Sequence, residues 1–382
     1  METFLLTEDQ LRERSGGKWR RYPPDVVPAF VADMDFKVAP AIQAAVTRLT
    51  DAQDYGYGQM TETDALFEAF SDWMARRHGW HPDPALAIAN SDVVQGLYAT
   101  ILAFSEPDDG VIVHTPVYPP FLRAIEETGR RIVANPLVDD GTRFVVDVEG
   151  LQRVASEGSM ILLCNPHNPT GRVLDRSELE AIAAVAAQRG MTIVADEIHS
   201  DLVYPGATHI PMETVAAASQ RTVTLNSATK GFNIAGLRAS IAHFGSAALK
   251  ERLVTLLPER LLGRPGRTGV AATIAAWCEG EAWLDEVMHY LDGNRRRVAE
   301  WAARANFGHH LPEATYLAWI DCRRLDLPEG VSPQQHFLEH AKVGLTDGVD
   351  FGTPGLGHVR LNFATSEGIL EEILERLTAA LD

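Results

Sequence analysis

Short apolar runs rich in β-branched residues alternate with longer helical patterns through the middle of the chain. The apolar runs are nearly continuous in hydrophobicity and do not alternate with polar positions, which is typical of strands covered on both faces. We therefore expect buried strands at residues 111–113, 131–133, 160–163, 192–195 and 222–225.

One helix between these strands has clear start and stop signals. Asp175 and Glu178 stand three residues apart, as in a capping box, and Gly190 follows the helical pattern as a stop signal. Strands and helices that take turns over about two hundred residues predict a mostly parallel sheet with helices on both faces. The expected fold class is therefore α/β, with a three-layer α/β/α large domain.

The two ends of the chain have a different pattern. Residues 1–40 contain several prolines and no long periodic segment, whereas a long amphipathic helical pattern and then turn-rich pieces follow residue 278. We expect a large domain over residues 41–278 and a smaller α+β domain built from residues 1–40 and 279–382.

Composition narrows the classes of function. The 382 residues include 34 Lys and Arg against 52 Asp and Glu, a net charge of −18, which argues against nucleic acid as a partner. No apolar run approaches the ~18 residues of a membrane span. Residues 1–14 lack the basic flank and apolar core of a secretory signal. The three cysteines are far apart and odd in number, which favours a reducing cytoplasm: Cys164, Cys278 and Cys322.

Candidate chemistry lies where strands end, because ligands of parallel α/β sheets bind at the carboxyl edge. The apolar run 93–98 turns through Gly96 and Leu97 into a helix, whose first amides suit a phosphate. Tyr118 follows the strand at 111–113 and can offer its face to a flat ring, or else be a half-buried core aromatic.

Two further strand exits carry polar side chains. Two Asn-Pro steps within residues 165–171 place amide side chains such as that of Asn168 at the sheet edge. Asp196 leaves the strand at 192–195 and needs a cation to offset its desolvation. That cation is either a metal, with His199 and His167 as further ligands, or a protonated nitrogen heterocycle.

Lysine is rare in this chain, with five residues in all, and only Lys230 leaves a buried strand amid small residues. A lysine in that position is desolvated, which lowers its pKa and lets it form a Schiff base. Ser227 and Arg238 flank it and can hold a phosphate. A phosphate cradle, a stacking ring, a carboxylate for a ring nitrogen and an amine for an aldehyde are together what pyridoxal phosphate requires.

Seven motifs carry a resemblance that covers essentially the whole chain. They are residues 30–36 (FVADMDF), 55–58 (YGYG), 165–171 (NPHNPTG), 196–202 (DEIHSDL), 233–238 (NIAGLR), 314–319 (ATYLAW) and 359–363 (VRLNF). With them the sequence resembles the fold type I pyridoxal-phosphate enzymes of the class I/II aminotransferase superfamily. Within that superfamily it most resembles the MalY/PatB-type cystathionine β-lyases.

The resemblance implies roles around the cofactor ring and the substrate. Lys230 is implied as the Schiff-base lysine and the proton carrier at the substrate α-carbon, Asp196 as the partner of the pyridine nitrogen, and Tyr118 as the stacking ring. Asn168 is implied at the ring oxygen and beside the substrate, whose carboxylate Arg360 clamps.

Other residues are implied at the phosphate and across a subunit interface. The backbone of Gly96 and Leu97, with Ser227 and Arg238, is implied as the phosphate site. Tyr57 is implied to reach the phosphate of the neighbouring subunit, which makes the enzyme a homodimer. His199 occupies the place where some relatives carry a ring-oxygen tyrosine, and otherwise it packs behind the site.

The implied reaction is α,β-elimination from L-cystathionine or another cysteine S-conjugate, which gives a thiol, pyruvate and ammonia. Phe30 stands where the group often has tryptophan, and residues 262–268 are unusually rich in arginine and glycine, so a conjugate other than cystathionine fits as well. The alternatives are an aminotransferase, a decarboxylase or an oxidative deaminase on the same scaffold, or a regulatory binding protein without turnover.

Overall fold

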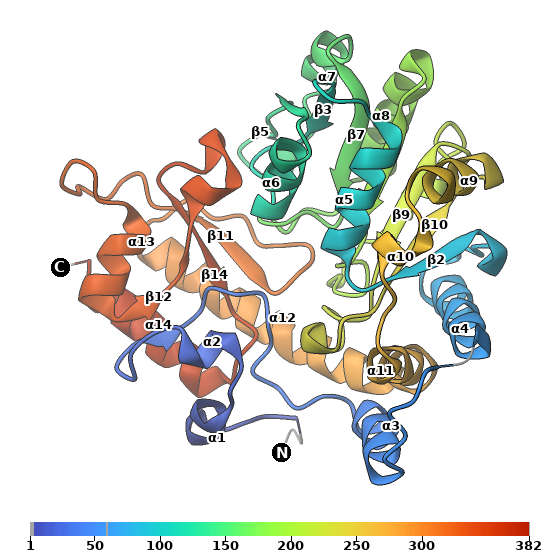
Figure 1. Cartoon of the computed structure of the whole chain (residues 1–382). Helices are drawn as coiled ribbons and strands as arrows, with labels where there is room; N and C mark the ends of the chain where they lie inside the picture. The colour runs from blue at the N-terminus through green and yellow to red at the C-terminus, as the bar shows by residue number, and fades with distance from the viewer. Residues whose placement is uncertain (1–3, 59, 382) are drawn as a thin grey trace.

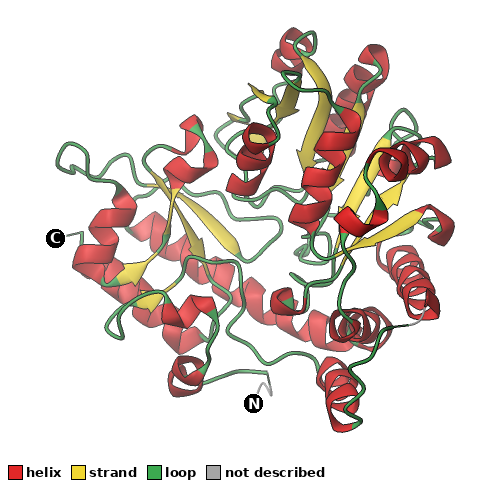
Figure 2. Ribbon diagram, in the orientation of Figure 1, coloured by secondary structure: helices red, strands yellow, loops and turns green. Residues whose placement is uncertain are grey.

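The computed structural model describes residues 4–58 and 60–381, and two main sheets organise them (Figures 1 and 2). The larger sheet has seven strands in the order β2-β10-β9-β8-β7-β3-β4. Pairing is parallel from β9 through β4, whereas β10 runs antiparallel to both of its neighbours. The strands are β2 (Ala87–Asn90), β3 (Gly110–Val113), β4 (Arg131–Ala134), β7 (Gly158–Cys164), β8 (Thr192–Asp196), β9 (Thr222–Asn226) and β10 (Ser240–Phe244).

Helices cover both faces of this sheet, which confirms the predicted fold class. Val111 and Val113 of β3 pack with α5 (Val93–Phe104), α6 (Pro119–Glu127) and α9 (Ala247–Leu256). Ile112, one residue out of phase, packs on the opposite face with α7 (Val148–Val154) and α8 (Arg176–Arg189). Because successive strand side chains point to opposite faces, this alternation buries β3 on both sides.

The predicted strands and the predicted helix are confirmed. All five apolar runs form strands β3, β4, β7, β8 and β9, each extended by one to three residues. Asp175 caps α8 and forms a reciprocal capping box with Glu178, and Gly190 ends the helix in the left-handed conformation at φ 68°. These local signals succeed because each is satisfied within a few residues of chain.

The smaller sheet is antiparallel, in the order β11-β14-β13, with β11 (Leu317–Asp321), β13 (Thr346–Asp347) and β14 (His358–Asn362). Figure 1 shows the blue N-terminal segment beside these orange and red elements. There β1 (Val27–Pro28) pairs in parallel with β12 (Val343–Gly344). Helices of this part are α1 (Glu8–Glu13), α2 (Gly17–Arg20), α12 (Glu281–Arg304), α13 (Pro333–His336) and α14 (Glu367–Ala379).

The remaining elements lie near the β2 edge or form a short hairpin. Helices α3 (Pro40–Asp51) and α4 (Met60–His78) both pack on α11 (Arg267–Glu279). Helix α10 (Glu259–Leu262) precedes α11, and β5 (Val138–Asp139) pairs with β6 (Phe144–Val145). Among residues 4–58 and 60–381, no helix is long and apolar enough to cross a membrane.

Candidate active site

The carboxyl ends of β7, β8 and β9 lie side by side and bring the candidate residues together. Cys164 at the end of β7 pairs with Asp196 on β8, and Asp196 pairs with Leu225 on β9. The loops that follow β7 and β9 carry Asn168 and Lys230. Consecutive parallel strands end at the same edge, so residues more than sixty positions apart in sequence become neighbours here.

Lys230 points from this edge to the N-terminal segment. Its Nζ donates a hydrogen bond to the carbonyl of Ala32 at 2.6 Å, and Tyr316 Oη donates to the same carbonyl at 2.9 Å. Burial lowers the pKa of the Lys230 amine, and the carboxylate of Asp33 acts in the opposite direction. A desolvated amine of this kind is a ready nucleophile and proton acceptor. Tyr316 lies within the motif at residues 314–319, but the pattern of that motif does not predict this contact.

Asp196 is the carboxylate that faces the site. It is 6% exposed, and its Oδ1 accepts a hydrogen bond from the backbone N–H of Ile198 at 3.0 Å. Burial raises its pKa to about 7. The adjacent Glu197 is used elsewhere, because it accepts from the Met212 N–H at 2.7 Å and lies 3.2 Å from His209 Nε2. Asp196 therefore remains to meet a cationic group from a ligand.

Arg360 on β14 is buried, with 4% exposure, and is therefore not a surface arginine. Its Nη1 donates to Asn168 Oδ1 at 2.9 Å, and its Nη2 donates to the carbonyl of Phe30 at 2.9 Å. Its Nε has no hydrogen-bond partner among the described residues. Burial lowers the pKa of Arg360 to about 10, so the guanidinium is still charged at neutral pH. A buried guanidinium held by neutral oxygens is suited to a carboxylate ligand.

Two ring side chains complete the wall around Lys230. Tyr118 caps the start of α6 and is half-buried; burial raises the pKa of its hydroxyl, and the charges of Arg360 and Asp196 act on it as well. His199 is buried, and burial lowers its pKa to about 3, so its ring is neutral. Its Nδ1 has no partner within the described chain, which makes it available to a ligand.

The metal alternative finds no support in the described residues. No three His, Cys, Asp or Glu side chains within 4–58 and 60–381 are placed to hold a metal ion. His167, one of the candidate ligands, instead has its Nδ1 2.9 Å from Thr170 Oγ1 within its own loop.

The start of α5 differs from the prediction. The helix begins at Val93, with Asp92 as its cap: the Gln95 N–H donates to Asp92 Oδ1 at 2.8 Å, and the Gly96 N–H donates to the Asp92 carbonyl at 3.2 Å. The Gly96 amide is therefore used inside the helix, and the role of Gly96 and Leu97 at the phosphate stays a prediction.

The amides left at the open end of α5 belong to Val93 and Val94, its first two residues. The missed signal is the spacing of Asp92 and Gln95, which is that of a capping box. Gly96 also lets α5 approach β9 closely, since a Cβ there would lie 3.0 Å from Leu225 Cδ2.

Ser227 and Arg238 lie in the loops after β9 and before β10, close to this helix end. The Ser227 hydroxyl donates to the carbonyl of Ala239 at 2.5 Å and accepts from the Thr229 N–H at 3.2 Å. Arg238 pairs with Asp92, the cap of α5, at 3.2 Å, and its side chain is 69% exposed. The cation and the open helix end together form a site for an anion.

Tyr57 stands apart from this group within a single chain. It is fully exposed and lies on a groove of about 910 Å³, which residues 262–268 also line. The predicted contact of Tyr57 with a phosphate therefore requires a second subunit.

Comparison with known proteins gives the family. Residues 31–377 match the family model described as aminotransferase class I and II. The chain belongs to that family. The predicted superfamily is thereby confirmed, and the groups at the strand ends occupy one edge of its central sheet.

Relatives within the family extend along the whole chain. The putative cystathionine beta-lyase of Mycobacterium leprae is 38% identical over 98% of this chain and 97% of that protein. The cystathionine beta-lyase PatB of Bacillus subtilis is 35% identical over 94% and 93%. Cystalysin from Treponema denticola, whose crystal structure contains a pyridoxal 5′-phosphate cofactor, superposes with a TM-score of 0.93 at 29% identity, over 100% of this chain and 99% of that one.

Proposed function

We propose that this protein is a pyridoxal-phosphate-dependent carbon–sulfur lyase. It cleaves L-cystathionine or another cysteine S-conjugate to a thiol, pyruvate and ammonia. The observation that carries the proposal is that the desolvated Lys230 amine and the buried Asp196 carboxylate meet at one sheet edge, which the charged Arg360 reaches from β14 through its hydrogen bond to Asn168. The names of the relatives at 35–38% identity support a lyase over an aminotransferase.

The residues present fit this cofactor. Lys230 suits its aldehyde, and the buried carboxylate of Asp196, whose Oδ1 accepts from the Ile198 N–H, suits its ring nitrogen. Tyr118 offers its ring face, and the orphaned Nδ1 of buried His199 and the amide of Asn168 are available to ring substituents. The phosphate fits Ser227, Arg238 and the open amides of α5. When bound, the cofactor withdraws electrons from the substrate α-carbon.

The chain's own groups bind the substrate and move its protons. Arg360 holds the substrate carboxylate, which fixes the orientation of the α-carbon. Lys230, whose lowered pKa increases its fraction of free amine, removes the α-proton. Asp196 keeps a negative charge beside the ring nitrogen. The thiolate then leaves from the β-carbon, which is feasible because the pKa of an unperturbed thiol is about 8.5.

We also propose a cytoplasmic homodimer in which Tyr57 of each protomer reaches the phosphate site of the other. The full exposure of Tyr57 and the groove beside it support this arrangement. The three cysteines are free, which supports a reducing compartment.

The test is a pyruvate assay on cofactor-loaded protein with L-cystathionine and no keto acid. We expect sustained release of pyruvate and homocysteine with the aldehyde form of the cofactor retained. A single turnover that leaves the cofactor in its amine form would make the protein an aminotransferase. Lys230→Ala abolishes the reaction, whereas Lys37→Ala, which changes an exposed lysine, does not. Full activity of the Lys230→Ala protein would overturn the assignment.

A further inference from the structure

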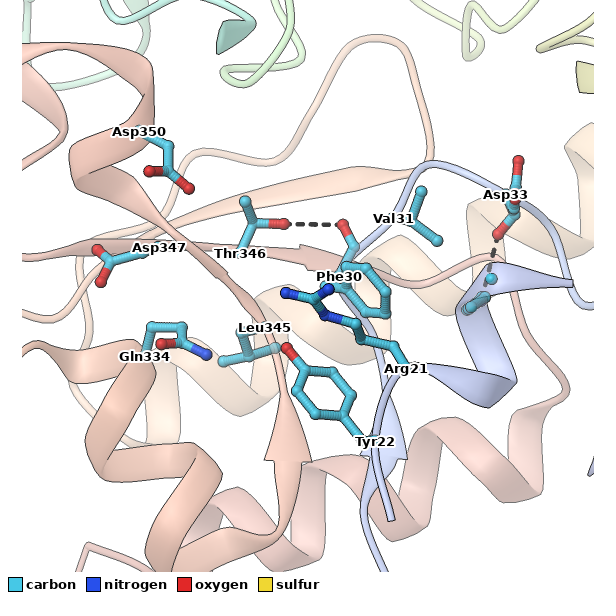
Figure 3. Close-up of a pocket in the computed structure, with 12 residues that line it drawn as sticks. Arg21, Tyr22, Phe30, Val31, Asp33, Gln334, Leu345, Thr346, Asp347 and Asp350 are labelled. Atoms are coloured by element: carbon cyan, nitrogen blue, oxygen red, sulfur yellow. Dashed lines mark hydrogen bonds between the residues drawn. The ribbon is translucent and has the colours of Figure 1, made fainter. Parts of the chain in front are cut away.

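A pocket of about 420 Å³ lies between the N-terminal segment and β13, next to the residues described above (Figure 3). Arg21 and Tyr22 form one wall. Residues 30–33, which we call the 30–33 segment, form a second wall. Thr346, Asp347 and Asp350, on β13 and the turn after it, form the third.

The pocket adjoins the active site because both use the 30–33 segment. The carbonyl of Phe30 accepts a hydrogen bond from Thr346 Oγ1 at 2.8 Å on the pocket side and one from Arg360 Nη2 at 2.9 Å. The carbonyl of Ala32 accepts from Lys230, whereas the side chains on either side of it, Val31 and Asp33, line the pocket. Arg360 Nη2 also donates to Oγ1 of the pocket residue Thr346 at 3.3 Å, so the pocket begins directly beside the guanidinium.

The pocket carries charges of both signs. Lys18 also lines it but is neutralised, since its Nζ lies 2.7 Å from Asp35 Oδ2 in a buried pair. The charges that remain are the guanidinium of Arg21 and three carboxylates. Figure 3 shows Arg21 extending across the pocket toward the wall that carries Asp347 and Asp350.

An arrangement with a cation on one wall and carboxylates on another suits a ligand that has both an anionic and a cationic group. Between them, Phe30, Val31 and Leu345 provide an apolar surface. That surface fits the methylene groups that would join such charges to a sulfur atom.

We propose that this pocket receives the leaving-thiol half of the substrate and selects a thiol that is itself an α-amino acid. The carboxylate of that thiol lies at Arg21, and its ammonium group lies at Asp347 and Asp350. This inference rests on the proposed lyase function and adds residues that set its substrate class. The pocket distinguishes amino-acid thiols from neutral alkyl or aryl thiols, which leave the charged groups on both walls unpaired.

The test uses four substrates that differ only in the far end. L-Cystathionine has both distal charges, S-(3-carboxypropyl)-L-cysteine lacks the ammonium group, S-(3-aminopropyl)-L-cysteine lacks the carboxylate, and S-propyl-L-cysteine lacks both. We expect kcat/KM of the wild-type enzyme to be highest for cystathionine and lowest for the propyl compound, with the difference mainly in KM.

Two substitutions assign the charges to residues. Arg21→Ala lowers the preference for cystathionine over the aminopropyl compound by about tenfold, the size expected for one charge-assisted hydrogen bond. Asp347→Asn lowers the preference for cystathionine over the carboxypropyl compound, and asparagine retains the bond that Asp347 Oδ1 makes with the Val349 N–H. Arg20→Ala, which removes the neighbouring arginine outside the pocket, leaves both preferences unchanged.

Binding gives a readout that does not depend on turnover. In the Lys230→Ala background, calorimetric titration shows tighter binding of cystathionine than of S-propyl-L-cysteine, and Arg21→Ala removes most of that difference. If the enzyme eliminates all four substrates with equal kcat/KM, or if Arg21→Ala leaves the preferences intact, the pocket assignment is wrong while the lyase function stands. If none of the four is eliminated and cystathionine is transaminated instead, the proposed function itself fails.

Discussion

At the scale of single residues, Asp196 links the chemistry of the site to the stability of the protein. Burial raises its pKa to about 7, so without a cationic partner the folded chain holds a proton there that the unfolded chain releases near pH 4. In the cofactor-free protein, its contribution to stability is therefore fully present below about pH 4. It is lost as the pH rises to about 7.

This behaviour predicts a pH-dependent difference between the wild type and Asp196→Asn. The measurement is urea unfolding of the cofactor-free proteins. Between pH 4 and pH 7.5, the free energy of unfolding of the wild type should fall by roughly 2–4 kcal/mol relative to that of the variant, since each unit of pKa shift corresponds to about 1.4 kcal/mol. Buried histidines such as His114 and His167 shift stability in the opposite sense, but equally in both proteins. A difference that stays constant with pH would contradict the buried, unpaired state of Asp196.

Single residues could be found from the sequence where few candidates existed. Lys230 stands out because only five lysines occur and only one leaves a buried strand. The hydrogen bonds of Arg360 could not be predicted, because Asn168 and Phe30 lie 192 and 330 positions away. Such contacts depend on how the two sheets are placed, which no local pattern encodes.

At the scale of elements, the start of α5 shows how a strand with little local preference is missed. The sequence pattern predicts an apolar run over residues 93–98 that turns into a helix at Gly96. In the structure, the strand is Ala87–Asn90 and the helix begins at Val93. Alanine and asparagine have low β propensity. β2 forms because it pairs with β10, more than one hundred and forty positions away, with Asn90 opposite Ser240.

The cap of α5 gives a prediction at this scale. Asp92→Ala should lower the free energy of unfolding by about 1 kcal/mol, because the Gln95 N–H loses its acceptor. Asp92→Asn keeps an acceptor and loses only the exposed ion pair with Arg238, so it should cost about 0.5 kcal/mol or less. Urea unfolding of the two variants measures both quantities, and equal losses would show that the ion pair, not the cap, supports the helix.

At the scale of the whole molecule, the segments that complete the site come from both ends of the chain. The 30–33 segment is held by the pairing of β1 with β12 and by Asn362, whose amide donates to the carbonyls of Val31 and Asp33 at 2.6 and 2.7 Å. Substrate contacts on this segment therefore depend on the packing of the N-terminal and C-terminal regions against the large sheet. The fold class could be predicted from the alternation of strands and helices, but this packing of the two ends of the chain could not.

The surface around Tyr57 is the site of the proposed subunit interface. Tyr55 is 71% exposed, and Leu261, close to the same groove, is also 71% exposed. Large apolar side chains gathered beside a groove are typical of a protein interface. A second copy of the chain would cover them and bring Tyr57 to the neighbouring phosphate site.

Subunit complementation tests this arrangement directly. Tyr57→Ala and Lys230→Ala proteins should each have little activity alone. In a hybrid dimer, one site combines both defects, while the other combines an intact Lys230 with an intact Tyr57 from the neighbouring protomer. Unfolding and refolding an equal mixture should therefore restore about a quarter of the wild-type sites, since half of the dimers are hybrids with one intact site each. A mixture no more active than the average of its parents would show that Tyr57 does not act across the interface.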